Sequence, residues 1–390
     1  MNEIIASEMN KFGINNFFNS SQKYTETLFP EMSLDKLFTS TLNGNVFSLL
    51  RNNSLIKIFY KEFRTTIGLM SSVLIIIIVH TIFKTIVDGL KNSENSKIAY
   101  FLQYLLIVTL VVESFVLILD LTRETVKNIV NFMNLLIPLM ITLMLTTGSL
   151  TTTSVFQPAL IFLTSFIGNF IENFVIPLLM VSIVLSIISN LSDKIQVDKL
   201  SKFFRSFIVW VLGILLTLFT CILSLEGTLS SGVDGVASKT TKAAVSTLVP
   251  VVGKIMGDTV DSIIGCTNIL KNSVGVIGII IIIGIIAVPT IKILIMWFSF
   301  KLMAVVCEPV SDEKIVKLFE QIADSYKIML AILISVSAMF IISITLVIKI
   351  TNSVLMYRWQ YDFKIKNVVW RTDNCNINFC NYRNYLARRK

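Results

Sequence analysis

The chain has 390 residues, of which 54% are hydrophobic and only 15% are charged, and its formal net charge is +9. This composition excludes an ordinary soluble globule, because too few polar residues are present to cover its surface. Uncharged apolar blocks such as residues 73–79 (VLIIIIV) and 279–286 (IIIIIGII) lie in stretches approaching the length of about 20 residues that a helix needs to cross a bilayer. The sequence therefore predicts an all-α, polytopic integral membrane protein.

The N-terminal region, residues 1–64, mixes polar and apolar side chains, with local helical spacing in Met32, Leu34, Leu37 and Leu42. This pattern predicts a small amphipathic helical region ahead of the first membrane span. The first fifty residues show neither the basic start nor the short apolar run of a secretory signal peptide. Export of the N-terminus is therefore not encoded in an obvious way.

Eight candidate spans follow, in a first membrane region (65–224) and a second one (274–350). The third and fourth are short, and the polar breaks at 146–154 (TTGSLTTTS) and 169–173 (NFIEN) are only just long enough to turn the chain. These two spans are therefore expected to be tilted or re-entrant. The predicted spans cover residues 66–84, 98–119, 134–147, 155–169, 174–190, 207–224, 274–298 and 328–350.

Two amphipathic helices are predicted at the membrane surface, each opened by a Ser-Asp pair that can cap a helix. The first covers residues 192–207 and the second begins at Ser311. Both follow one span and precede another, which suggests a duplicated unit of span, surface helix and span, with chance similarity as the alternative. Their apolar faces contain Ile195, Leu200, Phe203, Phe204 and Phe207 in the first helix and Ile315, Leu318, Phe319, Ile322 and Tyr326 in the second.

The basic residues predict an orientation. Because cytoplasmic loops are enriched in Lys and Arg, the more basic set of short loops is expected to be cytoplasmic, with both termini outside. The other set carries only Arg123 and Lys127, and the basic final segment (RNYLARRK, 383–390) is the one feature that argues against an external C-terminus. The basic residues of the first set are Lys84, Lys91, Lys97, Lys194, Lys199, Lys202, Arg205, Lys301, Lys314, Lys317 and Lys327.

A glycine-rich amphipathic connection, residues 225–273, joins the two membrane regions. Gly253 and Gly257 make a G-x-x-x-G pattern, in which the missing side chains let helix backbones approach closely. Helix packing within one molecule is the simpler interpretation, and a self-association or pore-lining surface outside the cytoplasm is the other. Pro250 and Pro289 are expected to shape helix ends. The candidate packing or assembly glycines are Gly232, Gly235, Gly253, Gly257, Gly275 and Gly278.

Ionisable residues at membrane depth are the candidates for chemistry, because charged groups are costly there. The candidates are His80, Glu113, Glu172 and Lys292, either as an ion or proton relay or, more simply, as interhelical hydrogen-bond partners. The sequence contains no phosphate-loop, zinc-helix or nucleophile-elbow motif, so we expect no enzyme, cofactor or metal site. One C-x4-C pair has no histidine nearby, and the basic tail, 351–390, contains no nucleic-acid-binding module.

Several long segments resemble one protein family. They are SSGVDGVASKTTKAAVSTLVPVVGKIMGDTVDSIIGC, LKNSVGVIG and CEPVSDEKIV, preceded by FQPALIFL and VLSIISNLSDKIQVDKLSKFFR. Their order and spacing resemble the stage III sporulation protein AE family over about residues 30–356. Members commonly begin with a signal peptide and end near residues 352–358, so the tail is expected not to be native to the family. A shifted reading frame or a late start codon in the gene would explain both departures.

The resemblance implies a non-enzymatic, multi-pass component of the channel between mother cell and forespore, located in the mother-cell membrane around the forespore. It implies as partners membrane lipid and other stage III sporulation channel proteins, including ring-forming subunits and a secretion-type ATPase, together with self-association and no nucleic acid. Two alternatives stay open. One is a secondary transporter that uses Glu113, Glu172 and Lys292 near the bilayer midplane, and the other is a scaffold that only anchors the ring proteins.

Overall fold

The computed structural model describes residues 13–25, 54–89, 93–147, 149–191, 197–248, 252–309 and 311–349. Within these ranges all regular structure is helical, as the sequence predicts. We refer to the last described helix as the final helix. The helices are α2 (Ile14–Thr25), α5 (Ser54–Gly89), α6 (Ser93–Thr146), α7 (Leu150–Phe170), the π-helix η1 (Ile171–Val175), α8 (Ile176–Leu191), α9 (Asp198–Leu248), α10 (Val252–Cys307) and the final helix (Glu313–Lys349).

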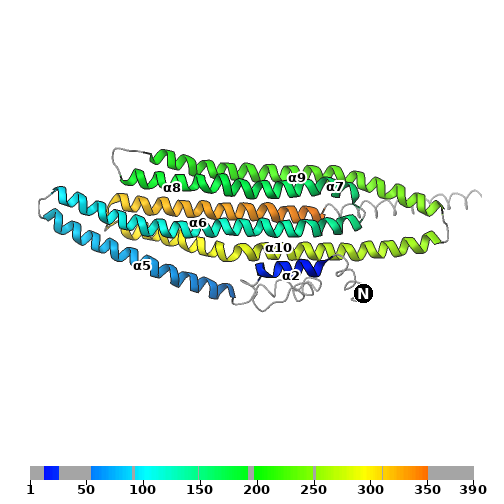
Figure 1. Ribbon diagram of the computed structural model, residues 1–390, viewed down its shortest axis with the longest axis horizontal. Coiled ribbons are helices and arrows are strands. Elements are labelled where there is room, and N and C mark those ends of the chain that lie inside the picture. The colour runs from blue at the N-terminus through cyan, green and yellow to red at the C-terminus, as the bar shows by residue number, and fades with distance from the viewer. Residues whose placement is uncertain are drawn as a thin grey trace, which may run out of the picture.

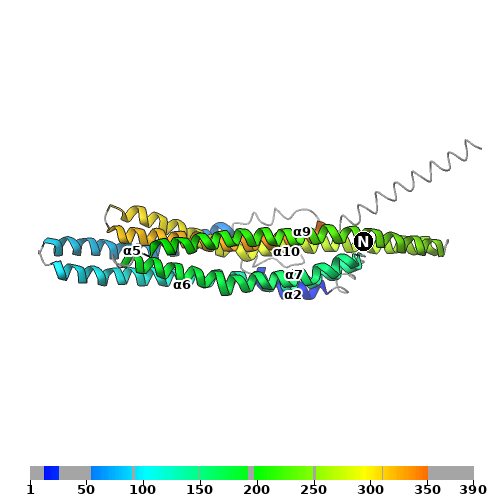
Figure 2. The ribbon, with the colours of Figure 1, turned by 90° about the horizontal axis from the view of Figure 1, so that it is seen from above.

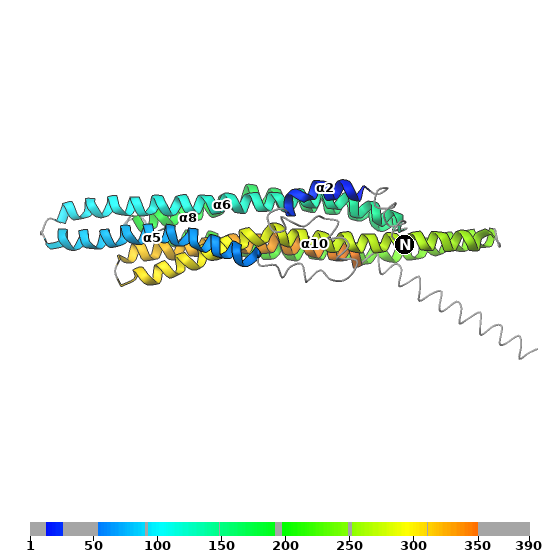
Figure 3. The same ribbon diagram turned by 90° about the horizontal axis from the view of Figure 1, so that it is seen from below.

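The long helices lie side by side along one axis and form an elongated bundle (Figure 1). α5 meets α6, α8 meets α9, and α10 meets the final helix toward one end of the bundle, whereas α9 and α10 reach furthest at the opposite end. The views from above and below show the same narrow shape (Figure 2 and Figure 3). The short α2 lies against α6, where the rings of Phe17 and Tyr24 contact Phe132 with centroid distances of 6.0 and 5.9 Å.

The final helix supplies much of the core. All five residues of its predicted apolar face are buried, so the helical period identified that face correctly. Tyr326 contacts Phe115 of α6 and Phe300 of α10, with ring centroids 6.1 and 5.3 Å apart. Further along, Phe340 packs edge-on against Phe219 of α9. The second predicted surface helix is therefore the first part of a long interior helix.

The described part of the first predicted surface helix also continues without a break, as the start of α9, whereas residues 192–196, with Ile195, lie outside the described residues. Its predicted apolar face points outward, since the side chains of Leu200 and Phe203 are 44% and 59% exposed. The buried residues of this segment are instead Ser201 and Arg205. The reason is the solvent: lipid accepts an apolar face, so the polar face of a membrane helix turns toward protein partners.

Six helices among the described residues, rather than the predicted eight, are long and apolar enough to cross a membrane. Predicted spans two and three are both part of α6. The polar segment between them stays helical, and several of its polar side chains find partners on the same helix: Arg123 lies 3.6 Å from Asp120, and Thr122 and Thr125 donate to carbonyl oxygens four residues earlier. Arg123 and Lys127, which were expected in a loop, consequently lie inside α6.

Predicted spans four and five are likewise continuous, through α7, η1 and α8. The expected break at 169–173 was wrong, because the chain passes this point as a π-helical turn. The break at 146–154 is a real turn, in which the Ser149 N–H donates to the Met144 carbonyl oxygen at 3.3 Å before α7 begins. The third and fourth predicted spans are therefore parts of long helices and not re-entrant segments.

The basic loops still lie on one side, as predicted. Spans two and three form one helix, and so do spans four and five, so two crossings are lost together and the later helices keep their predicted direction. The helix ends on both sides of 90–92, 192–196 and 308–312 lie toward the same end of the bundle (Figure 1). Which end faces the cytoplasm stays a prediction. The glycine-rich connection belongs to the opposite end, where α9 continues to Leu248 and α10 begins at Val252.

Candidate functional site

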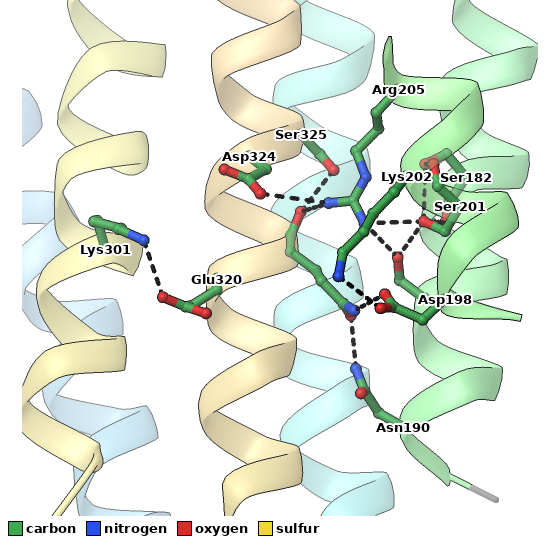
Figure 4. A network of polar contacts seen from close by, with 12 residues as sticks. Ser182, Asn190, Asp198, Ser201, Lys202, Arg205, Lys301, Glu320, Asp324 and Ser325 are labelled. Carbon is green, nitrogen blue, oxygen red and sulfur yellow. Dashed lines mark hydrogen bonds and ion pairs between the residues drawn. The ribbon is translucent and has the colours of Figure 1, made fainter. Parts of the chain in front are cut away.

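The side chain of Arg205 lies between α8, α9 and the final helix and is the most densely hydrogen-bonded cation in the described bundle (Figure 4). Its Nη1 donates to the Gln321 carbonyl oxygen at 2.9 Å. Its Nη2 donates to the hydroxyl oxygens of Ser186 and Ser201 at 3.0 and 2.9 Å. The Asp324 carboxylate lies 3.9 Å from Nη1, so the buried guanidinium also has an opposite charge nearby.

Three serines bring α8 and α9 close together beside this arginine. The Ser201 hydroxyl donates to the Ser182 carbonyl oxygen at 2.8 Å, and its oxygen lies 2.6 Å from that of Ser186. All three side chains are fully buried. Small hydroxyl side chains allow close helix contact and still leave oxygen atoms to accept from Arg205.

The side chain of Gln321 in the final helix forms hydrogen bonds that extend the contacts around Arg205. Its Oε1 accepts from the Asn190 side chain at 2.6 Å, and its Nε2 donates to Asp198 at 2.8 Å. Asp198 in turn pairs with Lys202 at 2.7 Å. We call these residues the Arg205 network: Ser182, Ser186, Asn190, Asp198, Ser201, Lys202, Arg205, Gln321 and Asp324.

The Arg205 network fixes α8, α9 and the final helix relative to one another. A hydrogen bond to a charged group contributes about 1.5–3 kcal/mol, and leaving such a group buried without partners costs at least as much. Ser186, Ser201 and Arg205 are buried between the helices, where no water replaces a lost partner, so the cost of breaking the contacts is high. Within the described ranges no group of three or more His, Cys, Asp or Glu side chains is placed to hold a metal ion. The geometry is that of a structural clamp.

Two further ion pairs join helices on the outer side of the bundle. Lys301 of α10 contacts Glu320 of the final helix at 3.0 Å, with both side chains 49% exposed. Lys292 of α10 lies 3.8 Å from Glu62 of α5. The exposed Lys301–Glu320 pair stabilises the protein by about 1 kcal/mol or less, whereas Glu62 of the second pair is only 19% exposed.

A polar cavity of ≈ 240 Å³ lies between α6 and the π-helical turn. Its lining combines cations, a carboxylate and amides in the middle of two long apolar helices. Glu172 enters the lining from η1, where the Ile176 N–H bonds to the Ile171 carbonyl oxygen five residues earlier. The residues of the lining are Arg123, Val126, Lys127, Val130, Asn131, Asn134, Ser165, Gly168, Asn169, Glu172 and Ile176.

The π-helical turn explains how this polar segment stays within one helix. A π turn contains one residue more than an α turn, which displaces its side chains sideways, and such turns are frequent at functional sites. Gly168 just before it lies against α6, since a Cβ there would come within 2.9 Å of Val130. The cavity therefore lies beside a close helix contact.

The structure separates the predicted ionisable residues. Glu172 lines the cavity, whereas Glu113 is exposed on α6 and Lys292 faces Glu62. His80 lies in α5, with its side chain outside the described residues. The transporter alternative placed three of these charges near one substrate site, but only Glu172 belongs to the cavity lining.

The predicted glycines divide into two groups. Gly275 and Gly278 lie at helix crossings, because a Cβ at Gly278 would come within 2.8 Å of Leu136 in α6 and one at Gly275 would collide with Ile348. The other group lies in the bundle's distal part, Gly232 and Gly235 in α9 and Gly253 and Gly257 in α10.

Of the two prolines expected to shape helix ends, Pro289 lies inside α10 and does not end that helix. Pro250 lies outside the described residues.

Sequence reasoning missed the centre of the clamp. Arg205 was counted only as a basic loop residue, and Gln321 and the serines were not singled out. A signal was present, since Ser201 and Arg205 are four residues apart on one helical face, as are Gln321 and Ser325. Lys271 was also missed, although its side chain is fully buried in α10 and contacts Asn268 at 3.4 Å.

Comparison with known proteins adds a family to this geometry. The family described as stage III sporulation protein AE matches residues 32–351. The chain is similar to the stage III sporulation protein AE of Bacillus subtilis (strain 168), with 28% identity over 290 residues, which are 74% of this chain and 73% of that protein. No solved structure matches. The matched range includes every helix from α5 to the final helix.

Proposed function

Because the chain belongs to the stage III sporulation protein AE family and therefore has a role in sporulation, we propose that it is a non-enzymatic membrane component of the multiprotein channel linking mother cell and forespore. The single observation that carries this proposal is the family match across all the membrane-length helices. The proposed location is the mother-cell membrane around the forespore. The proposed partners are other stage III sporulation proteins, including ring-forming subunits and a secretion-type ATPase.

The lengths of the apolar helices support membership in a complex. Four apolar stretches, Tyr104–Thr146, Leu150–Asn190, Ile264–Cys307 and Glu313–Lys349, contain 43, 41, 44 and 37 residues. At about 1.5 Å per residue these stretches are roughly 55–66 Å long, whereas the hydrocarbon core of a bilayer is about 30 Å thick. One bilayer cannot cover such helices if they stand upright. Apolar surface beyond it would be covered by partner proteins or by other copies of the chain.

The distal parts of α9 and α10 are the proposed contact region for those partners. They contain the glycine-rich segment and extend furthest from the basic end of the bundle (Figure 1). With the basic end in the cytoplasm, this region lies outside it, where extracytoplasmic subunits of a channel can reach it.

A tracer experiment in sporulating cells tests the channel role. After in-frame deletion of the gene, a small fluorescent solute loaded into the mother cell is expected not to reach the engulfed forespore, and the wild-type gene is expected to restore passage. Affinity purification of the chain from sporulating cells after cross-linking is expected to recover other stage III proteins. A sporulation defect with undiminished tracer passage would contradict the channel role and leave only the general role in sporulation.

A transporter is the second candidate, favoured by the polar cavity that Glu172 lines. The two functions differ in what the chain does alone. A transporter moves a solute when it is reconstituted by itself in vesicles, whereas a channel component needs its partners. We expect the purified chain alone to move no solute, and uptake that Glu172→Gln abolishes would favour the transporter instead.

A further inference from the structure

A groove of phenylalanine side chains adjoins the polar cavity. Phe162, Phe166, Phe170 and Phe174 follow one another at four-residue spacing along α7 and η1, with successive ring centroids 6.0, 5.8 and 4.9 Å apart. They line an open apolar groove of ≈ 610 Å³. Ser165 and Asn169 line both the groove and the cavity, so the two spaces form one continuous surface.

The cavity has polar groups that the protein leaves available. Within the described ranges, Lys127 and Glu172 form no ion pair, although both line the same cavity. Arg123 approaches Asp120 at 3.6 Å through Nη1, but its Nε is buried and has no hydrogen-bond partner among the described residues. The Arg123 Nε–H, the Lys127 ammonium and the Glu172 carboxylate are therefore available to a bound group.

The position of the cavity along the bundle matches a membrane interface. Phe174 at the end of the groove contacts Phe207 of α9, and Phe207 contacts Trp210, which is 64% exposed. Phe207 also lies two residues beyond Arg205, so the cavity and the Arg205 network are at similar levels. Exposed tryptophan and basic residues gather at the headgroup level of a bilayer. Phosphate and amine groups of lipids are therefore the chemistry available to the cavity.

We propose that the cavity and the phenylalanine groove together bind one phospholipid whose headgroup carries a phosphate and an ammonium, such as phosphatidylethanolamine. Arg123 and Lys127 bind the phosphate through charge-assisted hydrogen bonds. Glu172 and the side-chain oxygen atoms of the neighbouring asparagines accept from the ammonium. An acyl chain lies along the phenylalanine groove and covers its exposed aromatic rings. The site does not depend on the proposed channel role.

Native mass spectrometry of the full chain in detergent tests the proposal, with phosphatidylethanolamine and phosphatidylglycerol added at matched concentrations. The double variant Arg123→Gln, Lys127→Gln is expected to retain phosphatidylethanolamine about ten-fold less well, because charged hydrogen bonds are lost. Glu172→Gln is expected to remove the preference for phosphatidylethanolamine over phosphatidylglycerol. The matched control is Lys301→Gln, Glu320→Gln, which neutralises an ion pair elsewhere on the bundle and is expected to change neither value.

Retention of both lipids at wild-type levels by the double variant would overturn the proposal. So would equal retention of the two lipids by the wild-type chain. A third arm adds soluble phosphoethanolamine, which has the headgroup but no acyl chain. It is expected not to displace the lipid, and displacement at the lipid's own concentration would show a soluble ligand instead.

A second measurement needs no variant and so does not depend on how the variants fold. Phosphatidylethanolamine with a photoreactive group on one acyl chain is bound to the wild-type chain and cross-linked. The label is expected on the peptide that contains Phe162 to Phe174. Label confined to other helices would place the lipid elsewhere and refute the site.

Discussion

Arg205 of α9 donates to the main-chain carbonyl oxygen of Gln321, 116 residues further along the chain, at 2.9 Å. The bond joins the helix hairpin of α8 and α9 to the final helix, which is buried at this level. A main-chain acceptor cannot be removed by changing the side chain of Gln321. Only a change of Arg205 can therefore remove this contact, so the test replaces Arg205.

Replacement of Arg205 by methionine is expected to destabilise the chain by about 2–4 kcal/mol, because Ser186, Ser201 and the Gln321 carbonyl oxygen lose a charged donor inside the bundle. Thermal unfolding in detergent, followed by circular dichroism, measures the loss. Lys202→Met is the control, because Lys202 pairs with Asp198 in a more exposed position and is expected to cost about 1 kcal/mol or less. Equal effects of the two variants would show that burial of Arg205 contributes nothing.

Gly278→Ala is expected to destabilise the contact between α6 and α10, because the new Cβ would lie 2.8 Å from Cδ2 of Leu136. Overpacking costs about 1–3 kcal/mol, and the better helix propensity of alanine offsets up to about 1 kcal/mol of this, so a net loss of about 1–2 kcal/mol is expected. Gly213→Ala is the matched control, since a Cβ there meets no other atom within 4 Å and alanine is the better helix former. The unfolding midpoint is expected to fall for Gly278→Ala and not for Gly213→Ala. Adding Leu136→Ala to Gly278→Ala is expected to restore part of the lost stability.

Gly253→Leu, Gly257→Leu tests the glycine-rich segment as an assembly surface. The double variant is expected to stay in the membrane and to lose its association with channel partners, because leucine prevents close approach of helix backbones. Co-purification from sporulating cells measures the association. Gly213→Leu, on an open face of α9, is the control and is expected to co-purify normally. Unchanged co-purification of the double variant would assign the G-x-x-x-G pattern to packing within one molecule.

Cysteine accessibility tests the orientation. In a chain whose five native cysteines are replaced, single cysteines are placed at Lys199, Ser246 and Ser311. A membrane-impermeant maleimide added to intact vegetative cells, which are made to produce the chain in their cell membrane, is expected to label only Ser246→Cys, since the other two lie at the basic end of the bundle. Labelling of Lys199→Cys and Ser311→Cys instead would place the glycine-rich segment in the cytoplasm and refute the proposed contact with extracytoplasmic partners.

The helical class and the buried face of the final helix followed from the sequence. Apolar composition and the length of the apolar blocks are sufficient to predict the helical class. The spacing of Ile315, Leu318 and Ile322 is sufficient to predict the buried face. The same periodicity gave the wrong inward face for α9. A period shows which residues share a face, but the surroundings decide whether that face turns inward, and α9 leaves far more of its length exposed than the final helix does.

The number of helices could not be read from polarity alone. Asp120, Arg123, Glu124 and Lys127 make this part of α6 resemble a loop in a hydropathy profile, yet the helix continues through them. Glu172 likewise makes residues 169–173 look like a break between two helices, but its side chain lines the polar cavity within a continuous helix. The Arg205 network could not be predicted either, because its partners are separated by up to 131 residues and meet only in the folded bundle.

The extra residue of the π-helical turn sets the rotation of everything that follows it in α8. One residue corresponds to about 100° of turn in an α-helix. Ser182, Ser186 and Asn190 therefore face Arg205 and Gln321 only because this residue is present between Ile171 and Val175. Deleting a single residue there would keep the helix intact and turn its hydroxyl-bearing side away from the clamp, so this short insertion determines the alignment of one half of the bundle with the other.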